Sequence, residues 1–297
     1  MNTPLIYIAG FGRSGSTLIE DFLQRNYDAT GLGELFFIWE RGAIRNERCS
    51  CGESFHDCPF WTEVLSDGFG RLERADYVEF NRLFQEARGE YPVPGTMNRA
   101  EQLARGRFGE ISRTLYASIF KQLGSSVLID SSKYPLFGAS LKASGAGSPT
   151  PLHIYRDPRA VAASWQRVRR RPEANEEQQY MARSRSVLTS AMRWLWFNHT
   201  ALQLRDMSDS SGLSLGYEEF CASPDAVIKK IAANFNLSPR TSYDGVIGHS
   251  VSGNPSRFNG GFEKIRLDEG WKRELSTGQK IVLTALCETY YRRLLTA

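Results

Sequence analysis

Short apolar runs alternate with longer amphipathic segments over most of the chain. Four apolar runs have the length and composition of strands buried in a parallel sheet: residues 5–9, 127–129, 152–155 and 213–215. Helical periodicity predicts helices at 14–24, 76–88, 98–123, 135–143, 158–168, 176–207, 224–235 and 276–295. Strands that alternate with helices form βαβ units. The pattern therefore predicts an α/β fold with a central parallel sheet and helices on both faces.

Two stretches of the sequence show neither the apolar runs of strands nor the periodicity of helices. Residues 41–75 contain three cysteines, and residues 238–272 are rich in Gly, Ser and Asn, so both are expected to be irregular. Proline and glycine at 91–96 join two helices and do not mark a domain boundary. The chain contains no internal repeat and no low-complexity segment, so we expect one domain spanning residues 1–297.

Polar residues follow each predicted strand at the point where it ends. Arg13 follows the first strand, Lys133 the second, Arg156 the third and Tyr217 the fourth. Ligands of parallel sheets bind outside the carboxyl ends of the strands. The sequence therefore predicts that these side chains belong to one site.

The first strand runs into the glycine-rich segment GFGRSGST at residues 10–17. Its spacing is that of a phosphate-binding P-loop, but Ser16 stands where that motif has lysine, and the cation of the loop is Arg13. Glycines let backbone N–H groups turn inward, and the start of the next helix favours anions. An arginine fork suits phosphate or sulfonate oxygens. The segment predicts an anion site; the alternative is an ordinary turn between strand and helix.

Composition and charge narrow the class of ligand. The chain has 297 residues, 41% hydrophobic and 12% aromatic, and a formal net charge of +4. This mildly basic balance, with a pI of about 8.8, suits an anionic ligand but is weaker than the basic stripe of a nucleic-acid binder. No apolar run approaches the ~20 residues of a transmembrane helix, and the N-terminus lacks a signal-peptide pattern. We expect a cytoplasmic protein without nucleic-acid partners.

A second anion site is predicted after the third strand. Arg156 ends this strand, Pro158 suits the first turn of a new helix, and Ser164 lies about two turns into that helix. A strand-end arginine and a helix hydroxyl can converge on one phosphate. The alternative is a local salt bridge between Arg156 and Asp157, with Ser164 on the helix surface.

The two loop motifs together resemble those of sulfotransferases that use 3′-phosphoadenosine 5′-phosphosulfate (PAPS). GRSGST resembles the family's 5′-phosphosulfate loop, and YRDPRAVAAS its 3′-phosphate motif. Arg13 in place of the loop lysine is similar to carbohydrate sulfotransferases. LSLGYEEF, HSVSGNPSRF, CSCGESFHDCPFW and DSSKYP resemble further segments, the last three of bacterial members. The resemblance implies a P-loop NTPase-like three-layer fold and metal-independent sulfuryl transfer from PAPS, with PAP as product, to a hydroxyl or amine.

The resemblance also implies roles for individual residues. The donor would be bound by the loop, the second motif and the segments near the C-terminus: Gly12, Arg13, Ser14, Gly15, Ser16, Thr17, Arg156, Ser164, Tyr217, Asn254 and Arg257. Arg13 would also stabilise charge on the leaving phosphate. Lys133 would contact the sulfonate or the 5′-phosphate, or else pair with Asp130 at the surface.

Glu34 is the predicted catalytic base. It follows the first helix in the segment GLGELFFIWERG, and carbohydrate sulfotransferases place a glutamate in a similar region. A carboxylate in a pocket formed by Phe36, Phe37 and Trp39 would have a raised pKa. The alternative is a helix cap, and the rival bases are the four histidines, with His249 the strongest: His56, His153, His199 and His249.

Cys49, Cys51, His56 and Cys58 lie within ten residues. Zinc sites prefer two to four residues between paired cysteines, so this spacing is a weak metal signal. A disulfide to Cys58 fits the spacing but not a cytoplasmic location. We therefore predict reduced or partly oxidised thiols near the acceptor entrance and no bound metal.

Two other functions remain open at this stage. A P-loop kinase of small molecules would use a similar loop, although Ser16 replaces its lysine. A PAP-binding protein without activity would be expected to lack Arg13 and Glu34. The acceptor is not identified; a glycan, a lipid and another small molecule are all compatible with the sequence, and so is a homodimer.

Overall fold

The computed structural model describes residues 4–124, 127–167, 169–170, 180–181, 186–207, 212–241, 248–253 and 265–296. Asn254 and Arg257, two of the predicted donor contacts, lie outside the described residues. None of the helices in the described ranges is long and apolar enough to cross a membrane.

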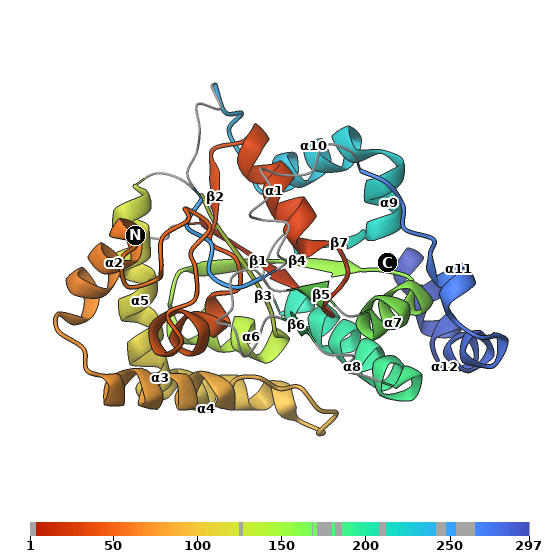
Figure 1. Ribbon diagram of the computed structural model, residues 1–297, viewed down its shortest axis with the longest axis horizontal. Coiled ribbons are helices and arrows are strands. Elements are labelled where there is room, and N and C mark those ends of the chain that lie inside the picture. Colours follow the sequence, from red (N-terminus) through yellow and green to blue (C-terminus); the bar gives the residue numbers. More distant parts are fainter. Residues whose placement is uncertain are drawn as a thin grey trace.

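A five-stranded sheet forms the centre of the molecule (Figure 1). All its paired strands are parallel, in the order β2-β3-β1-β4-β7. The strands are β1 (Pro4–Ala9), β2 (Ala29–Gly31), β3 (Val127–Lys133), β4 (Ser148–Tyr155) and β7 (Leu213–Gly216). The predicted parallel α/β fold is confirmed, and four of the five strands were predicted from apolar runs. The missed strand, β2, is short and has little apolar surface.

Both faces of the sheet are covered by helices. Successive side chains of a strand point to opposite faces, and β1 follows this rule. Leu5, Tyr7 and Ala9 belong to one buried cluster, whereas Ile6 and Ile8 belong to another. The second cluster packs under α1 (Ser16–Asn26), α9 (Tyr217–Ala222) and α10 (Pro224–Asn234), and Figure 1 shows these helices together on one side of the sheet.

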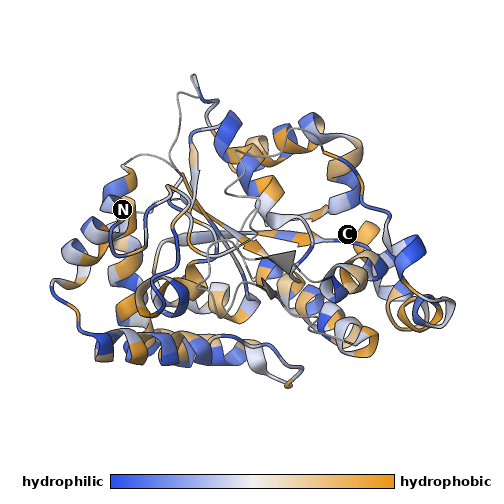
Figure 2. Cartoon of the chain, in the orientation of Figure 1, coloured by the Kyte–Doolittle hydropathy of each residue, from blue (hydrophilic) through white to orange (hydrophobic). Residues whose placement is uncertain are grey.

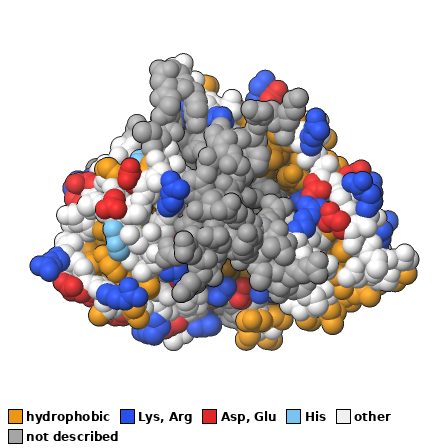
Figure 3. All heavy atoms as spheres, viewed as in Figure 1, with side chains coloured by type: hydrophobic (Ala, Val, Ile, Leu, Met, Phe, Trp, Pro, Cys, Tyr) orange, Lys and Arg blue, Asp and Glu red, His pale blue; other side chains and the backbone are white. Residues whose placement is uncertain are grey.

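The opposite face is covered by helices from the middle of the chain: α2 (Pro59–Phe69), α3 (Arg74–Glu86), α4 (Ala100–Arg105), α5 (Arg107–Leu123), α6 (Pro135–Ser144) and α8 (Val187–Asp206). Three shorter helical turns lie nearby in the chain: η1 (Leu35–Phe37) and η2 (Ile38–Ile44) precede α2, and η3 (Thr96–Arg99) joins α3 to α4. Figure 2 shows apolar colour on the strands and mixed colour on the helices, as expected for helices with one buried face. The face shown in Figure 3 carries interspersed side chains of both charges.

A third cluster lies at the β7 edge, where α7 (Pro158–Gln166) packs against α8 and against α12 (Thr277–Leu295). The short helix α11 (Trp271–Glu274) also packs on α7. There the Trp271 ring lies 4.5 Å from the Arg159 guanidinium carbon, so this tryptophan anchors the C-terminal segment. Arg167 adds ion pairs to Asp268 at 2.6 Å and to Glu274 at 2.8 Å.

The short helices α9 and α11 were not predicted, and the largest differences between predicted and observed helices are the following. Residues 41–75, predicted to be irregular, contain η2 and α2. The helix predicted at 98–123 is broken at Gly106, between α4 and α5. The helix predicted at 176–207 begins only at Val187, because Ser186 caps it by accepting the Thr189 N–H. Before it, β6 (Tyr180–Met181) pairs with β5 (Arg169–Arg170).

Candidate active site

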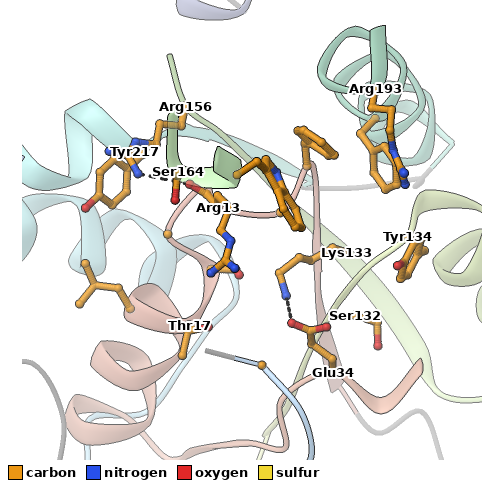
Figure 4. A pocket seen from close by; sticks show the side chains of 18 of the residues that line it. Arg13, Thr17, Glu34, Ser132, Lys133, Tyr134, Arg156, Ser164, Arg193 and Tyr217 are labelled. Atoms are coloured by element: carbon orange, nitrogen blue, oxygen red, sulfur yellow. Dashed lines mark hydrogen bonds and ion pairs between the residues drawn. The ribbon is translucent and has the colours of Figure 1, made fainter. Parts of the chain in front are cut away.

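One cavity of about 430 Å³ lies at the carboxyl ends of the strands. Segments that follow all five strands contribute to its wall, so the expected convergence of strand ends is observed (Figure 4). Ten residues with predicted roles line it: Gly12, Arg13, Gly15, Ser16, Thr17, Glu34, Lys133, Arg156, Ser164 and Tyr217.

The loop after β1 is a tight backbone turn. Gly10 has φ 137°, and a Cβ at this position would lie 2.3 Å from the Ile154 carbonyl oxygen, so only glycine fits. Arg13 has φ 77°, which is uncommon for a residue with a side chain and is typical of functional turns. Ser14 donates its hydroxyl to the Phe11 carbonyl at 2.8 Å. Ser14 therefore braces the loop and is not among the residues that line the cavity.

The loop leads directly into the N-terminus of α1. Gly15 precedes the helix with φ 89°, and Ser16 is its first residue. The first turn of a helix presents amides without intrahelical partners and carries a positive partial charge. The Arg13 guanidinium lies 5.0 Å from the Trp165 ring centroid and points into the cavity (Figure 4). Backbone and side chain thus create a compact positive region.

Arg156 lies beside this loop and is buried, with 6% of its surface exposed. It donates to the Arg13 carbonyl at 3.3 Å and to the Asp268 carbonyl at 3.1 Å. Its guanidinium carbon lies 4.5 Å from the Tyr217 ring centroid. Ser164, on α7, is also buried and lines the same part of the cavity. The strand-end arginine and the helix serine are therefore neighbours in one cavity wall.

The alternative interpretation of this motif is wrong. Asp157 does not form the expected local salt bridge with Arg156. Its carboxylate caps α7 by accepting the Arg159 N–H at 2.7 Å and pairs with the Arg159 guanidinium, also at 2.7 Å. Ser164 is 1% exposed, so it is not a surface serine.

Lys133 and Glu34 form an ion pair inside the cavity. Lys133 Nζ lies 2.5 Å from Glu34 Oε1 and also donates to the Ser131 carbonyl at 2.9 Å. The left-handed φ of 73° at Lys133 turns its side chain back over the end of β3. Asp130, the other predicted partner of Lys133, instead accepts hydrogen bonds from Tyr116 and Ser132. The pair places a carboxylate beside a cation inside the cavity.

Buried polar contacts hold Glu34 in place. The Glu34 N–H donates to the Val251 carbonyl at 3.0 Å. The Glu20 carboxylate, on α1, accepts the Gly33 N–H at 2.8 Å and the Ser131 hydroxyl at 2.6 Å. Burial raises the pKa of Glu20 to about 7. Glu20 therefore links the loop helix to the ends of both β2 and β3.

The far end of the cavity contains charged residues that the sequence did not indicate. Arg88 pairs with Glu90 at 3.2 Å, and Arg193 pairs with the same carboxylate. Burial, followed by repulsion from Arg88, lowers the pKa of Arg193 to about 10. Arg41 lies over the Phe37 ring at 4.4 Å. These arginines come from η2, from the segment after α3 and from α8, so no contiguous motif could have identified them.

The predicted aromatic pocket around Glu34 is only partly present. Phe37 lines the cavity together with Tyr134 and Phe197. Phe36 and Trp39 are fully buried in the main core and do not reach it. Their place in the core follows from η1 and η2, which direct these two rings toward α3 and α6.

None of the four histidines lines this cavity. His56 bonds the Ala43 carbonyl at 2.9 Å, and His153 is buried against Asn198. His199 is exposed on α8. His249, the expected rival to Glu34, lies beside Cys49 and Cys58. Of the predicted bases, Glu34 lies in the cavity and the four histidines lie outside it.

Comparison with solved structures identifies the fold. The sulfotransferase domain of the Synechococcus PCC 7002 olefin synthase superposes with a TM-score of 0.52 at 18% identity, over 98% of this chain and 96% of that chain. The chain has the sulfotransferase fold. The sulfotransferase domain of the curacin biosynthetic pathway gives a TM-score of 0.52 at 15% identity, covering 95% of this chain and 96% of its own.

Sequence comparison adds nothing to this assignment, since no protein-family model and no curated protein matches the chain. The resemblance found in the two loop motifs is thus confirmed at the level of the sulfotransferase fold. The cavity occupies the position at which parallel sheets of this kind bind ligands.

Proposed function

We propose that the chain transfers a sulfuryl group from PAPS to a hydroxyl or amine of a carbohydrate, lipid or other small-molecule acceptor. The observation that carries this proposal is the Lys133–Glu34 pair, which lies in the same cavity as the anion-binding loop. A base beside a cation at the edge of a phosphate cradle suits group transfer from a phosphate ester to a hydroxyl.

The residues near the loop fit a nucleotide with two separate anionic groups. Arg156 Nε is buried and has no hydrogen-bond partner among the described residues, so a ligand oxygen would satisfy it. A Cβ at Gly15 would lie 2.3 Å from the Tyr217 ring, and one at Gly12 would lie 3.0 Å from Trp165. The loop therefore has to stay free of side chains at both positions. We assign residues 12–17 to the 5′-phosphosulfate and Arg156 with Ser164 to the 3′-phosphate.

Each charged group then has a definite task. PAPS would supply a sulfuryl group whose bond to the 5′-phosphate oxygen breaks as the acceptor oxygen bonds to sulfur. Glu34 takes the proton that the acceptor loses. Arg13, Lys133 and the amides at the start of α1 stabilise the charge that grows on the phosphate. Because these groups supply the positive charge, we propose that turnover does not require a divalent metal.

The far end of the cavity supports an acceptor that carries an anionic group. Three guanidinium groups, those of Arg41, Arg88 and Arg193, line this end, with Glu90 as the carboxylate among them. Burial and then the nearby Arg88 lower the pKa of Arg193, so its positive charge is poorly solvated there. A carboxylate, sulfate or phosphate on the acceptor would stabilise these guanidiniums.

Binding of PAP tests the donor assignment. With PAP in about hundredfold excess over its Kd and EDTA present, we expect stabilisation by about 3 kcal/mol, or several degrees of Tm. Stabilisation by ATP with Mg²⁺ but not by PAP would instead support a small-molecule kinase. Transfer of labelled sulfate from PAPS to a panel of acceptors would then separate a catalyst from a protein that only binds PAP.

A further inference from the structure

Four metal-ligating side chains meet outside the cavity: Cys49, Cys51, Cys58 and His249. Their sulfur and ring nitrogen atoms all lie within 4.8 Å of one another. The three cysteines come from the segment between η2 and α2, whereas His249 lies about 190 residues later in the chain. Folding therefore adds a fourth ligand that the spacing of the cysteines does not reveal.

The distances agree with tetrahedral coordination of zinc. Zinc binds sulfur at about 2.3 Å and imidazole nitrogen at about 2.0–2.1 Å, so tetrahedral ligands stand about 3.8 Å apart for two sulfurs and about 3.6 Å for sulfur and nitrogen. Cys58 Sγ lies 3.7 Å from both Cys49 Sγ and Cys51 Sγ. His249 Nδ1 lies 3.3 Å from Cys58 Sγ and 3.8 Å from Cys49 Sγ.

We propose that Cys49, Cys51, Cys58 and His249 bind one zinc ion in a closed structural site. Three sulfurs and one imidazole are a ligand set that zinc uses in structural sites. His56, the histidine nearest to the cysteines in sequence, is turned away and bonds the Ala43 carbonyl instead. The expectation of free or partly oxidised thiols without a metal is replaced by this proposal.

Backbone amides interact with all three sulfurs: that of Cys51 with Cys49, that of Glu53 with Cys51 and that of Trp61 with Cys58. Such N–H groups stabilise negative sulfur.

The imidazole is also held in place. The His249 ring stacks on Phe60, with ring centroids 4.8 Å apart and an interplanar angle of 11°. The backbone carbonyl of His249 accepts the Trp61 indole N–H at 2.9 Å. These contacts fix the ring with Nδ1 toward the sulfurs.

The proposed zinc would fasten the segment 248–253 next to Glu34. Within this segment the Ser250 carbonyl accepts the Ser50 N–H at 3.2 Å, and the Val251 carbonyl accepts the Glu34 N–H at 3.0 Å. Ser252 accepts a hydrogen bond from Arg41 at 2.6 Å, and Gly253 lines the cavity. The ion would thus act as a clamp that positions the base. This consequence rests on the proposed function, whereas zinc binding does not.

Metal content is the first test. The wild type, Cys58→Ser and the control Cys221→Ser are purified under reducing conditions with the affinity tag removed, and zinc is measured by plasma mass spectrometry. Cys221 lies on α9, outside the cluster. We expect about one zinc per chain in the wild type and the control and less than about a tenth in Cys58→Ser. Less than about a tenth in the wild type, or equal zinc in all three, would overturn the proposal.

A second test keeps the wild-type chain and covers the case in which Cys58→Ser does not fold. Zinc is removed with a chelator and replaced by Co²⁺. Thiolate-to-cobalt charge-transfer absorption with the visible bands of a tetrahedral site supports the proposal; a spectrum without them contradicts it. Removal of zinc should lower Tm by roughly 10 °C, and zinc should restore it. A disulfide between two of these cysteines in the reduced preparation would also exclude the site.

Kinetic measurements then test whether the zinc positions Glu34. In zinc-depleted protein we expect kcat to fall about tenfold or more, because Glu34 loses a fixed position. The affinity for PAP should change little, because the loop at 10–17 makes separate contacts. Zinc content and Tm are measured without PAPS, so their outcome does not depend on whether sulfuryl transfer is confirmed. Full kcat after zinc loss would contradict the positioning role but leave the site.

Discussion

The two ends of the cavity are built in different ways. The end that we propose binds the donor, called the donor end, is formed largely by backbone: a strand end, a glycine turn and the start of α1, with Arg156 and Ser164 close by. The end that we propose binds the acceptor, called the acceptor end, is formed by long side chains on three separate segments, among them Arg41, Arg88 and Arg193. Figure 4 shows the Lys133–Glu34 pair between Tyr217 on one side and Arg193 on the other.

This difference separates what the fold provides from what the particular chain provides. Backbone amides are present for any sequence that can form the turn, so the cradle depends on glycines more than on side-chain identity. The arginines at the acceptor end could be exchanged without changing a strand or a turn. We therefore expect changes at the donor end to affect nucleotide binding, and changes at the acceptor end to affect acceptor choice.

The largest loss of activity is expected from a change at Glu34, which lies where the two ends of the cavity meet. Glu34→Gln keeps the size of the side chain but removes the group that takes a proton at neutral pH. We expect kcat to fall by about 10²–10⁴-fold, while PAP affinity stays within about twofold. Glu40→Gln is the control, because Glu40 pairs with Arg45 and does not line the cavity. If Glu34→Gln retains more than about a tenth of kcat, Glu34 is not the base.

The donor end could be predicted from sequence because its parts are contiguous. A strand, a glycine turn and a helix follow one another in residues 5–24, and Arg156 and Ser164 lie within one strand–helix unit. Parallel-sheet topology then brings these segments together without knowledge of any side-chain contact. Asn254 and Arg257 remain predictions.

The acceptor end and the place of His249 beside the cysteines could not be predicted, because they depend on pairings between distant segments. His249 reaches the cysteines only because the segment 248–253 pairs with the chain near Gly33 and Ser50. Arg193 reaches the cavity only because α8 packs across β4 and α6. Periodicity indicates which face of a helix is buried, but it does not specify which polar residue is directed into a cavity.

The next effect concerns Glu20, which links α1 to the ends of β2 and β3. Its pKa is raised from 4.5 to about 7, mainly by burial. Between about pH 4.5 and 7 the folded protein therefore keeps a proton on Glu20 that the unfolded chain releases. The contribution of this proton to the free energy of unfolding is complete below about pH 4.5 and is lost as pH rises toward 7. The shift corresponds to a loss of about 3 kcal/mol in the free energy of unfolding.

Glu20→Gln tests this through urea unfolding at pH 4.5 and pH 7.5. The amide can accept the Gly33 N–H and donate to Ser131, so the fold should survive. We expect the wild type to lose more stability than the variant over this range. Asp130, whose pKa burial raises to about 6, and His153, whose pKa burial lowers to about 4, titrate in both proteins. The difference between the two proteins therefore reports on Glu20 and on its electrostatic coupling to Asp130, and parallel pH profiles would contradict the role of Glu20.

A smaller effect is expected at the donor end from Arg156→Ala and Ser164→Ala. Loss of a charge-assisted hydrogen bond costs about 1.5–3 kcal/mol, so PAP affinity should fall about 10–100-fold with Arg156→Ala and less with Ser164→Ala. At saturating PAPS kcat should change little, because both side chains are assigned to a phosphate remote from the reacting bond. Arg159→Ala is the control, since Arg159 pairs with Asp157 and does not line the cavity. Unchanged KM with a collapsed kcat in both variants would refute the assignment.

The smallest effect is expected from a change at the acceptor end. This change is also the most direct test of whether the two ends of the cavity act independently. Arg193→Gln removes one of the two guanidiniums that share Glu90, while Arg88 keeps that carboxylate paired. With an acceptor that carries a carboxylate or sulfate, we expect KM for the acceptor to rise about tenfold, as for one charged contact, with PAP affinity unchanged. With a neutral analogue of the same acceptor, KM should hardly change. A variant that treats both acceptors alike would show that the arginines serve the packing of α8 and do not select charge. An equal loss of PAP affinity would show that the two ends of the cavity are not independent.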